Sequence, residues 1–380
     1  MLNHNTSQTI VLLRFPLAVM VVFIHSVDPV KYNVVDISWS DLCGYDIYLL
    51  IRSTISHVIS LVAVPSFFLI SGYLFFKKLE VWNWDIWKIK LKSRFYTLLV
   101  PYIIWTCLRV FYNRNLDYLL ESSSFDLSSY FSVLFSKFYI FGYFWHCFYS
   151  DDTVNWWGTP TLLSVPLHVP FWYLRDLIVL TLLSPFIYLL MKKWGGYILL
   201  FVGSLFISFT WPTWPFIYIK SVFFFMVGAY LSINRKDLLQ TIYSMRYIIY
   251  LLPLLIVMMV LSDGNSSMYS IITPWFILVG VVSIIYFTSK LQKQTFIKAF
   301  NKLSETSFFI FAFHIFVFVA FGQIEKQLTI HYTWPLLITL YFVKPLLAIV
   351  VSISIYYILR MVAPRISSYI CGYTSVKTSK

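Results

Sequence analysis

Residues 10–27 read IVLLRFPLAVMVVFIHSV, an apolar run that contains one arginine and one histidine. A helix that crosses a bilayer needs about 20 mainly apolar residues, because the hydrocarbon core is about 30 Å thick and each residue adds about 1.5 Å. Lipid offers no hydrogen bonds, so the backbone groups of such a run must be satisfied within the helix itself. The stretch therefore predicts an α-helical membrane protein.

The composition of the whole chain supports this prediction. Hydrophobic residues make up 59% of the 380 residues and charged residues only 12%, against about 25% in soluble proteins. The mean hydropathy is +0.75. A soluble globule of this length could not bury so much apolar surface in one core, so the composition excludes that class.

The formal net charge of +13 does not indicate nucleic-acid binding, because the Lys and Arg residues form short clusters between apolar runs. The four cysteines form no CxxC motif, so neither a metal site nor a redox motif is expected.

Similar apolar runs recur along the chain, and we expect about ten transmembrane helices within a single transmembrane domain of residues 1–380. The expected spans are 10–27, 57–76, 95–113, 171–190, 197–210, 216–233, 246–262, 270–289, 307–324 and 334–360. The fold class is therefore all-α and polytopic.

Charge in the loops predicts the orientation. Every second loop is basic, including 77–94, whereas the alternate loops carry most of the Asp residues. The positive-inside rule then places both termini in the cytoplasm and the longest loop region, about 114–170, outside. That region combines Trp residues with carboxylates, a pattern that suits either sugar binding or a membrane-interface belt.

Arg14 and His25 are the ionisable residues of the first span. Eleven residues of α-helix make about three turns plus 20° and rise about 16 Å, so both side chains lie on one helix face. Ionisable groups inside a membrane are costly and usually face a pathway or cavity. Two simpler interpretations stay open, namely an Arg14 that extends to the interface and a His25 that is packed and hydrogen-bonded.

The Arg14-x10-His25 pattern resembles the signature of the membrane acyltransferase-3 family. Further resemblance lies in residues 64–73, in Lys92-Ser93-Arg94 before Pro101, in residues 170–176, in residues 223–228 and in residues 307–314. Together these segments cover nearly the whole chain. The family usually has Arg-x-Arg where this chain has Lys92-x-Arg94, which puts a phosphate contact by Lys92 in doubt.

The resemblance implies an O-acyltransferase of the bacterial cytoplasmic membrane, acting on a surface or lipid-linked glycan. The donor would be a cytoplasmic acyl-CoA, expected to be acetyl-CoA, with no permanently bound cofactor. Lys92, Arg94 and Arg14 would hold this co-substrate, and His25 would be catalytic, either as a general base or as an acyl carrier. The alternative is a transporter or flippase for a lipid-linked glycan, but the sequence has no inverted repeat of the kind that transporters show.

Several further residues are candidates for holding the acceptor. Trp172, Tyr173, Arg175 and Asp176 could bind the glycan, or could form an ion pair with aromatic anchors at the interface. Glu305 and His314 are expected near the acyl-transfer cavity, although His314 could equally make a hydrogen bond between helices.

Other polar residues have simpler interpretations. Ser71 is expected to allow close packing together with Gly72. The remaining histidines of note, His57, His146 and His168, are expected near or outside the membrane and have no metal-ligand spacing.

Overall fold

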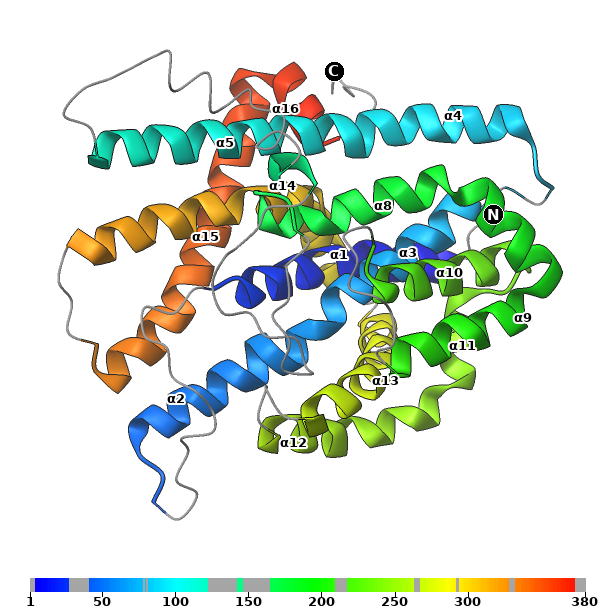
Figure 1. Ribbon diagram of the computed structural model, residues 1–380, viewed down its shortest axis with the longest axis horizontal. Helices are drawn as coiled ribbons and strands as arrows, with labels where there is room; N and C mark the ends of the chain where they lie inside the picture. The colour runs from blue at the N-terminus through cyan, green and yellow to red at the C-terminus, as the bar shows by residue number, and fades with distance from the viewer. Residues whose placement is uncertain are drawn as a thin grey trace.

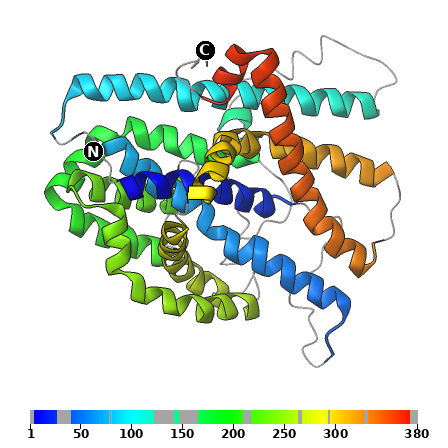
Figure 2. The same ribbon diagram turned by 180° about the vertical axis from the view of Figure 1, so that it is seen from behind.

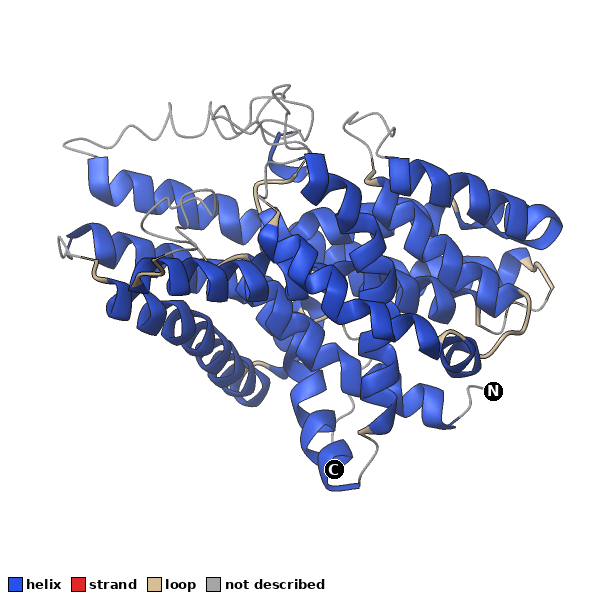
Figure 3. Cartoon of the chain, turned by 90° about the horizontal axis from the view of Figure 1, so that it is seen from below, coloured by secondary structure: helices blue, strands red, loops and turns tan. Residues whose placement is uncertain are grey.

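The computed structural model describes residues 4–26, 41–77, 79, 81–121, 142–145, 165–208, 217–262, 267–291, 294–327 and 332–372. Every regular element in these ranges is a helix (Figure 3). The expected loop region at 114–170 lies mostly outside the described residues, apart from the end of one helix, residues 142–145 and residues 165–170.

Seven helical stretches of the described chain are long and apolar enough to cross a membrane, and an eighth is added when one bent pair counts as a single span. The seven stretches are His4–Ile24, Gly44–Phe76, Trp84–Asn113, Ser184–Ser208, Ser267–Lys290, Ile297–Glu325 and Trp334–Val362. The bent pair is Leu238–Ser244 with Arg246–Leu261. The prediction of an all-α polytopic membrane protein is confirmed, while the count of ten spans and the position of the termini stay predictions.

The fourth and fifth expected spans, 171–190 and 197–210, are joined in the structure. Helix α8 (Trp172–Leu182) is followed directly by α9 (Ser184–Ser208), which is broken at Trp194, where φ is −132° and ψ is 24°. The expected spans 171–190 and 197–210 therefore share one nearly continuous helical stretch with a turn at Trp194. Helix α10 (Ile219–Ile233) follows as a short apolar helix.

The second and third spans begin earlier than the sequence predicted. Helix α2 (Gly44–Arg52), η2 (Ser53–Val58), η3 (Ile59–Val62) and α3 (Ala63–Phe76) follow one another without a gap. Helix α4 (Trp84–Arg94), η4 (Phe95–Leu99) and α5 (Val100–Glu121) do the same, and form one long rod along one side of the molecule (Figure 1).

The expected cytoplasmic loop 77–94 is therefore helical from residue 84. The side chain of Asn83 accepts hydrogen bonds from the backbone N–H groups of Asp85 and Ile86 at 2.8 and 3.1 Å. This N-cap satisfies donors that the first turn of a helix leaves unpaired, so the helix can begin before the apolar span does.

Helix α1 (His4–Ile24) lies in the middle of the molecule in the front and back views (Figures 1 and 2). It packs against α3, α13 (Ser267–Lys290), α14 (Gln294–Gln327) and α15 (Trp334–Val362). The remaining elements are η5 (Val169–Phe171), α11 (Leu238–Ser244), η6 (Arg246–Leu251), α12 (Leu252–Leu261) and α16 (Pro364–Ile370). The helix that carries Arg14 is thus surrounded by other helices.

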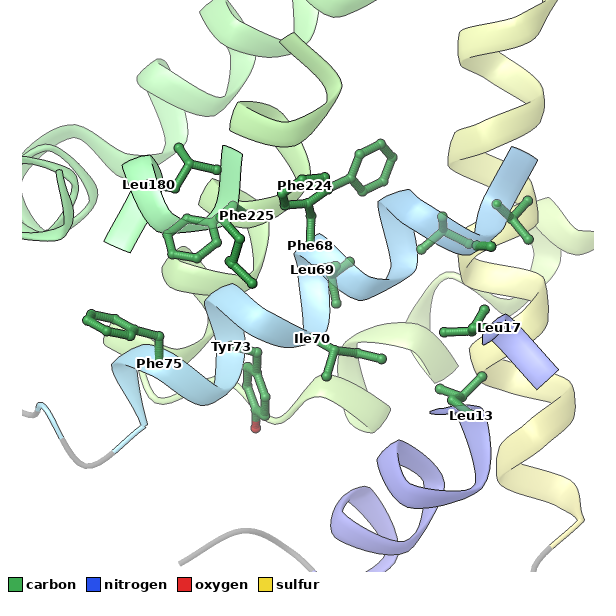
Figure 4. Packing of buried hydrophobic residues seen from close by; sticks show 14 of the residues in the cluster. Leu13, Leu17, Phe68, Leu69, Ile70, Tyr73, Phe75, Leu180, Phe224 and Phe225 are labelled. Carbon is green, nitrogen blue, oxygen red and sulfur yellow. The ribbon is translucent and has the colours of Figure 1, made fainter. Parts of the chain in front are cut away.

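Apolar side chains from α1, α3, α8 and α10 meet in the main core (Figure 4). Glycine lets α3 and α10 approach to backbone contact. A Cβ atom at Gly72 would lie 2.1 Å from the carbonyl oxygen of Phe225, and one at Gly228 would lie 2.1 Å from that of Leu69. Small residues of this kind allow close helix packing where lipid removes the hydrophobic drive for association.

Candidate active site

His25 directly follows the last residue of α1, Ile24. Its backbone N–H still bonds to the carbonyls of Val21 and Val22, at 3.3 and 3.2 Å, although the helix ends at Ile24. The helical path from Arg14 to His25 therefore continues almost unbroken, with Pro16 inside it. The side chain of Arg14 is exposed and that of His25 is half-buried. The two residues lie about 16 Å apart along the helix axis, as expected from the rise of an α-helix.

The imidazole of His314 on α14 lies beside that of His25. The two ring centroids are 5.5 Å apart and the rings are tilted by 35°. His314 is fully buried, and its Nδ1 lies 3.0 Å from the carbonyl oxygen of Ile310. A carbonyl can only accept, so Nδ1 carries the proton, and in the neutral ring Nε2 holds a lone pair. Among the described residues, this Nε2 has no hydrogen-bond partner.

His168 is a third buried imidazole in this region. Its exposed fraction is 0%, and neither ring nitrogen makes a hydrogen bond of ordinary geometry within the described chain, although the backbone of Ala312 lies close enough to interact with the ring. The ring meets Phe171 edge-on, with centroids 4.2 Å apart, and packs against Phe316 at 5.7 Å. His168 is close enough to His25, His314 and Arg109 to interact with them electrostatically.

The sequence predicts that His168 lies near or outside the membrane, and the structure shows in addition that its side chain is buried inside the protein. The 3-10 turn η5 directs the chain inward, since the N–H of Phe171 donates to the carbonyl of His168 at 2.8 Å. Burial, with a smaller contribution from the positive charge of Arg109, holds the pKa of His168 well below its ordinary value, so the ring is neutral at pH 7. The one sequence signal was the apolar setting of His168, between Leu167 and Val169.

A second polar group forms where α1, α3, α4 and α8 approach one another. Arg14, Arg94 and Tyr173 are close enough to interact electrostatically. The hydroxyl groups of Tyr173 and Ser71 are hydrogen-bonded at 3.2 Å, and the guanidinium carbon of Arg94 lies 5.9 Å from the ring centroid of Phe75. Two guanidinium groups that converge in this way suit a ligand with phosphate groups. The sequence predicted Arg14 and Arg94 at one site, and the structure brings them together.

Lys92 does not share this face of α4. Two helical residues differ by about 200° in direction, so Lys92 and Arg94 point to nearly opposite sides, and Lys92 is exposed. Lys90 is the basic residue on the face of Arg94, one turn earlier. Its Nζ lies 5.4 Å from the ring centroid of Phe75 and donates to the carbonyl oxygen of Lys77 at 2.8 Å. The i, i+4 spacing of Lys90 and Arg94 was visible in the sequence.

The residues of these two polar groups all fall within the part of the chain that a known family model matches. The model of the acyltransferase-3 family, described as an acyltransferase domain, matches residues 9–359. The chain belongs to this family. The resemblance stated from the sequence is thereby confirmed, and the protein is a membrane acyltransferase.

One relative of this acyltransferase covers almost the same length. The succinoglycan biosynthesis protein ExoH of Rhizobium meliloti strain 1021 is 24% identical over 388 residues, which cover 98% of this chain and 93% of the relative. No solved structure matches the chain.

The predicted acceptor residues Arg175 and Asp176 lie inside the acyltransferase, with exposed fractions of 2% and 0%. Nε and one NH2 nitrogen of Arg175 donate to Asp176 Oδ1 at 3.1 and 2.8 Å. Asp176 Oδ2 accepts from the hydroxyl of Ser221 at 2.7 Å and from the backbone N–H of Tyr218 at 3.1 Å. This network joins α8 to the start of α10. A role in holding the acceptor stays a prediction.

Trp172 and Tyr173 face different surroundings. The ring of Trp172 lies 4.8 Å from that of Tyr218, and the Nζ of Lys220 lies 4.7 Å from its centroid. Tyr173 instead belongs to the group with Arg14 and Arg94 described above. The neighbouring residues that the sequence assigned together to the acceptor therefore lie in separate parts of the site.

Glu305 is separated from His314. Nine residues of helix place two side chains on opposite faces, because they differ by about 180° in direction. The Glu305 carboxylate forms an ion pair with Arg360 at 2.7 Å, and both side chains are 51% exposed. Glu305 therefore lies on the helix face away from His314, and its role in substrate binding stays a prediction.

No metal site emerges from the described residues, which contain no group of three or more His, Cys, Asp or Glu side chains arranged to hold an ion.

Proposed function

We propose that this acyltransferase transfers an acyl group, expected to be acetyl, from cytoplasmic acyl-CoA to a hydroxyl of an extracytoplasmic or lipid-linked glycan. The observation that carries the proposal is that one helical path presents both Arg14 and His25, and that the ring of His25 lies beside that of His314 on α14. A cation group for the donor and an imidazole group for proton transfer lie about 16 Å apart on one helix. An acyl-CoA matches this separation, because its phosphates lie at one end of the molecule and its thioester lies at the end of a long arm.

In the proposed reaction, Arg14 and Arg94 bind the phosphates of the donor. A neutral His25 accepts the proton of the acceptor hydroxyl while the hydroxyl oxygen attacks the acyl carbonyl carbon. The C–S bond then breaks with its electron pair on sulfur, and the thiolate takes the proton back from His25. The products are the ester and free coenzyme A, so atoms, charge and protons balance.

A covalent route is compatible with the same geometry. Here His25 attacks the thioester first and passes the acyl group to the hydroxyl in a second step. His314 would favour either route, because its Nε2 lone pair can accept a hydrogen bond from His25 and so orient that ring. The two routes differ in kinetics, since only the covalent one can release coenzyme A before the acceptor binds.

Two observations support a glycan as the acceptor. The relative ExoH carries the name of a polysaccharide biosynthesis protein, and it matches this chain over nearly its whole length. The sequence between residues 145 and 157 also contains Trp145, Trp156 and Trp157 beside Asp151 and Asp152, residue types that can stack on and hydrogen-bond a sugar. Apart from Trp145, these residues lie outside the described part of the chain.

The proposal is tested by comparing cells with and without the gene. Envelope glycans are extracted and analysed by mass spectrometry for base-labile acyl esters. Membranes that contain the enzyme are then supplied with labelled acetyl-CoA, or with succinyl-CoA as the second donor, and with glycan from the gene-deletion strain. We expect labelled ester only with active enzyme. Identical ester content in both strains, with no transfer from either donor, would overturn the proposal.

A further inference from the structure

The acyltransferase buries an imidazole that the reaction above does not use. His168 has both ring nitrogens enclosed without a hydrogen bond of ordinary geometry to the described chain, although the backbone of Ala312 lies close enough to interact with the ring. Buried polar atoms are nearly always paired, and leaving one unpaired is unfavourable. Two such atoms on one ring therefore need an explanation outside the described protein groups.

The position of His168 indicates which kind of ligand could pair with its ring nitrogens. It enters from the segment before η5, on the side expected to face outward, whereas His25 comes from α1 and His314 from α14. All three rings are within range of electrostatic interaction. Two of them, His168 and His314, present ring nitrogens that no described group satisfies. Two separate segments of the chain thus bring unsatisfied imidazole nitrogens within range of His25.

The surroundings of His168 hold its ring in place. Phe171 packs edge-on against it at 4.2 Å and is itself stacked on Phe311, with ring centroids 5.8 Å apart and planes inclined by 7°. Phe316 closes another side at 5.7 Å. Apolar packing around a polar ring fixes its orientation and leaves the two nitrogens as its only means of binding a ligand.

The chemistry of a neutral imidazole suits a hydroxylated ligand. One nitrogen donates and the other accepts, and a hydroxyl group can meet either need because it is both donor and acceptor. A sugar presents several hydroxyls close together. A phosphate or carboxylate would satisfy the donor nitrogen only.

We propose that His168 binds the acceptor at its hydroxyl groups, on the outer side of the His25–His314 pair. This inference rests on the proposed function. His168 holds the acceptor while His25 takes the proton, so His168 is a substrate-binding residue of the reaction and requires no further step. Loss of its two hydrogen bonds should lower kcat/KM for the acceptor and leave the affinity for the acyl donor unchanged.

The test uses full-length enzyme in membranes, with labelled acetyl-CoA and envelope glycan from the gene-deletion strain. We expect His168→Phe, which keeps an aromatic ring, to lower kcat/KM for the glycan by about 10- to 100-fold, as the loss of two hydrogen bonds implies. The affinity for acetyl-CoA should stay within about twofold. His168→Asn, with one donor and one acceptor, should recover part of the activity. The matched control is His57→Phe, because His57 is exposed on η2 and should tolerate the change.

The outcomes separate the possibilities. Unchanged glycan kinetics in His168→Phe would overturn the proposal and assign His168 to packing. Equal loss of acetyl-CoA binding in both His168 variants would also overturn it, because the residue would then support the fold or the donor. Absence of transfer by the wild-type enzyme would instead contradict the proposed function itself.

Discussion

The two polar groups of this acyltransferase differ in how they are built. The group proposed to bind the acyl donor, called the donor group and defined as Arg14, Arg94 and Tyr173, consists of long side chains, and Arg14 is exposed. The histidine group, defined as His25, His314 and His168, has two rings that are fully buried. A charged donor can be held by flexible cations at an aqueous edge, whereas proton transfer needs rings with fixed orientation. The difference predicts that substitutions in the donor group will affect binding of the acyl donor, whereas substitution of His25 will affect the chemical step.

The largest effect should follow substitution of His25. His25→Ala removes the proposed base and should lower the rate by about 10²–10⁴-fold, or more if the residue carries the acyl group. His25→Gln keeps a hydrogen-bonding side chain but cannot accept a proton at neutral pH, so it should also be inactive. The measurement is acyl transfer to envelope glycan, normalised to the folded enzyme. Near-normal transfer by His25→Gln would make His25 structural and leave His314 as the next candidate.

The second largest effect should be on stability, outside both groups. Asp176→Ala leaves the buried Arg175 guanidinium without its carboxylate, and loss of one partner of a buried pair costs about 3–5 kcal/mol. The melting temperature in detergent should therefore fall clearly. In the enzyme that remains folded, kcat should change little. A stable Asp176→Ala protein with a raised KM for the glycan would instead support the acceptor role that the sequence suggested.

A smaller effect should distinguish Lys92 from Arg94 on α4. Arg94→Ala should raise the apparent KM for acyl-CoA by about 10- to 100-fold, because a hydrogen bond to a charged group contributes about 1.5–3 kcal/mol. Lys92→Ala should change it by less than about twofold, since Lys92 points away from Arg14. Donor kinetics of both variants, with kcat measured in parallel, provide the check. If the two variants are equally impaired, both basic residues contact the donor and the assigned face of α4 is wrong.

The smallest effect should come from Glu305→Gln. An exposed ion pair contributes about 0.2–1 kcal/mol, so the loss of the contact with Arg360 should hardly change the melting temperature. Activity should be unchanged, because Glu305 lies on the helix face opposite His314. Impaired use of the glycan by this variant would return Glu305 to the acceptor site.

The sequence predicted the parts of this molecule that follow from local patterns. Apolar runs indicated the helices, and the eleven-residue spacing indicated that Arg14 and His25 share a face. The charge pattern predicts that Lys92 and Arg94 act together, but on a helix the two side chains point to nearly opposite sides. The pairing of His25 with His314 depends on how α1 packs against α14, and the burial of His168 depends on a 3-10 turn. Neither feature follows from a local sequence period, because both depend on how distant helices pack against one another.

The contact between α3 and α10 at Gly72 limits the relative motion of these two helices. A methyl group at Gly72 would collide with the carbonyl oxygen of Phe225 at 2.1 Å, so the two backbones touch there. Helices in such contact cannot slide past one another by a turn without separating first. Ser71, next to Gly72, is hydrogen-bonded to Tyr173 of the donor group at 3.2 Å. The α3–α10 pair therefore holds the Ser71 hydroxyl at a fixed position beside Tyr173.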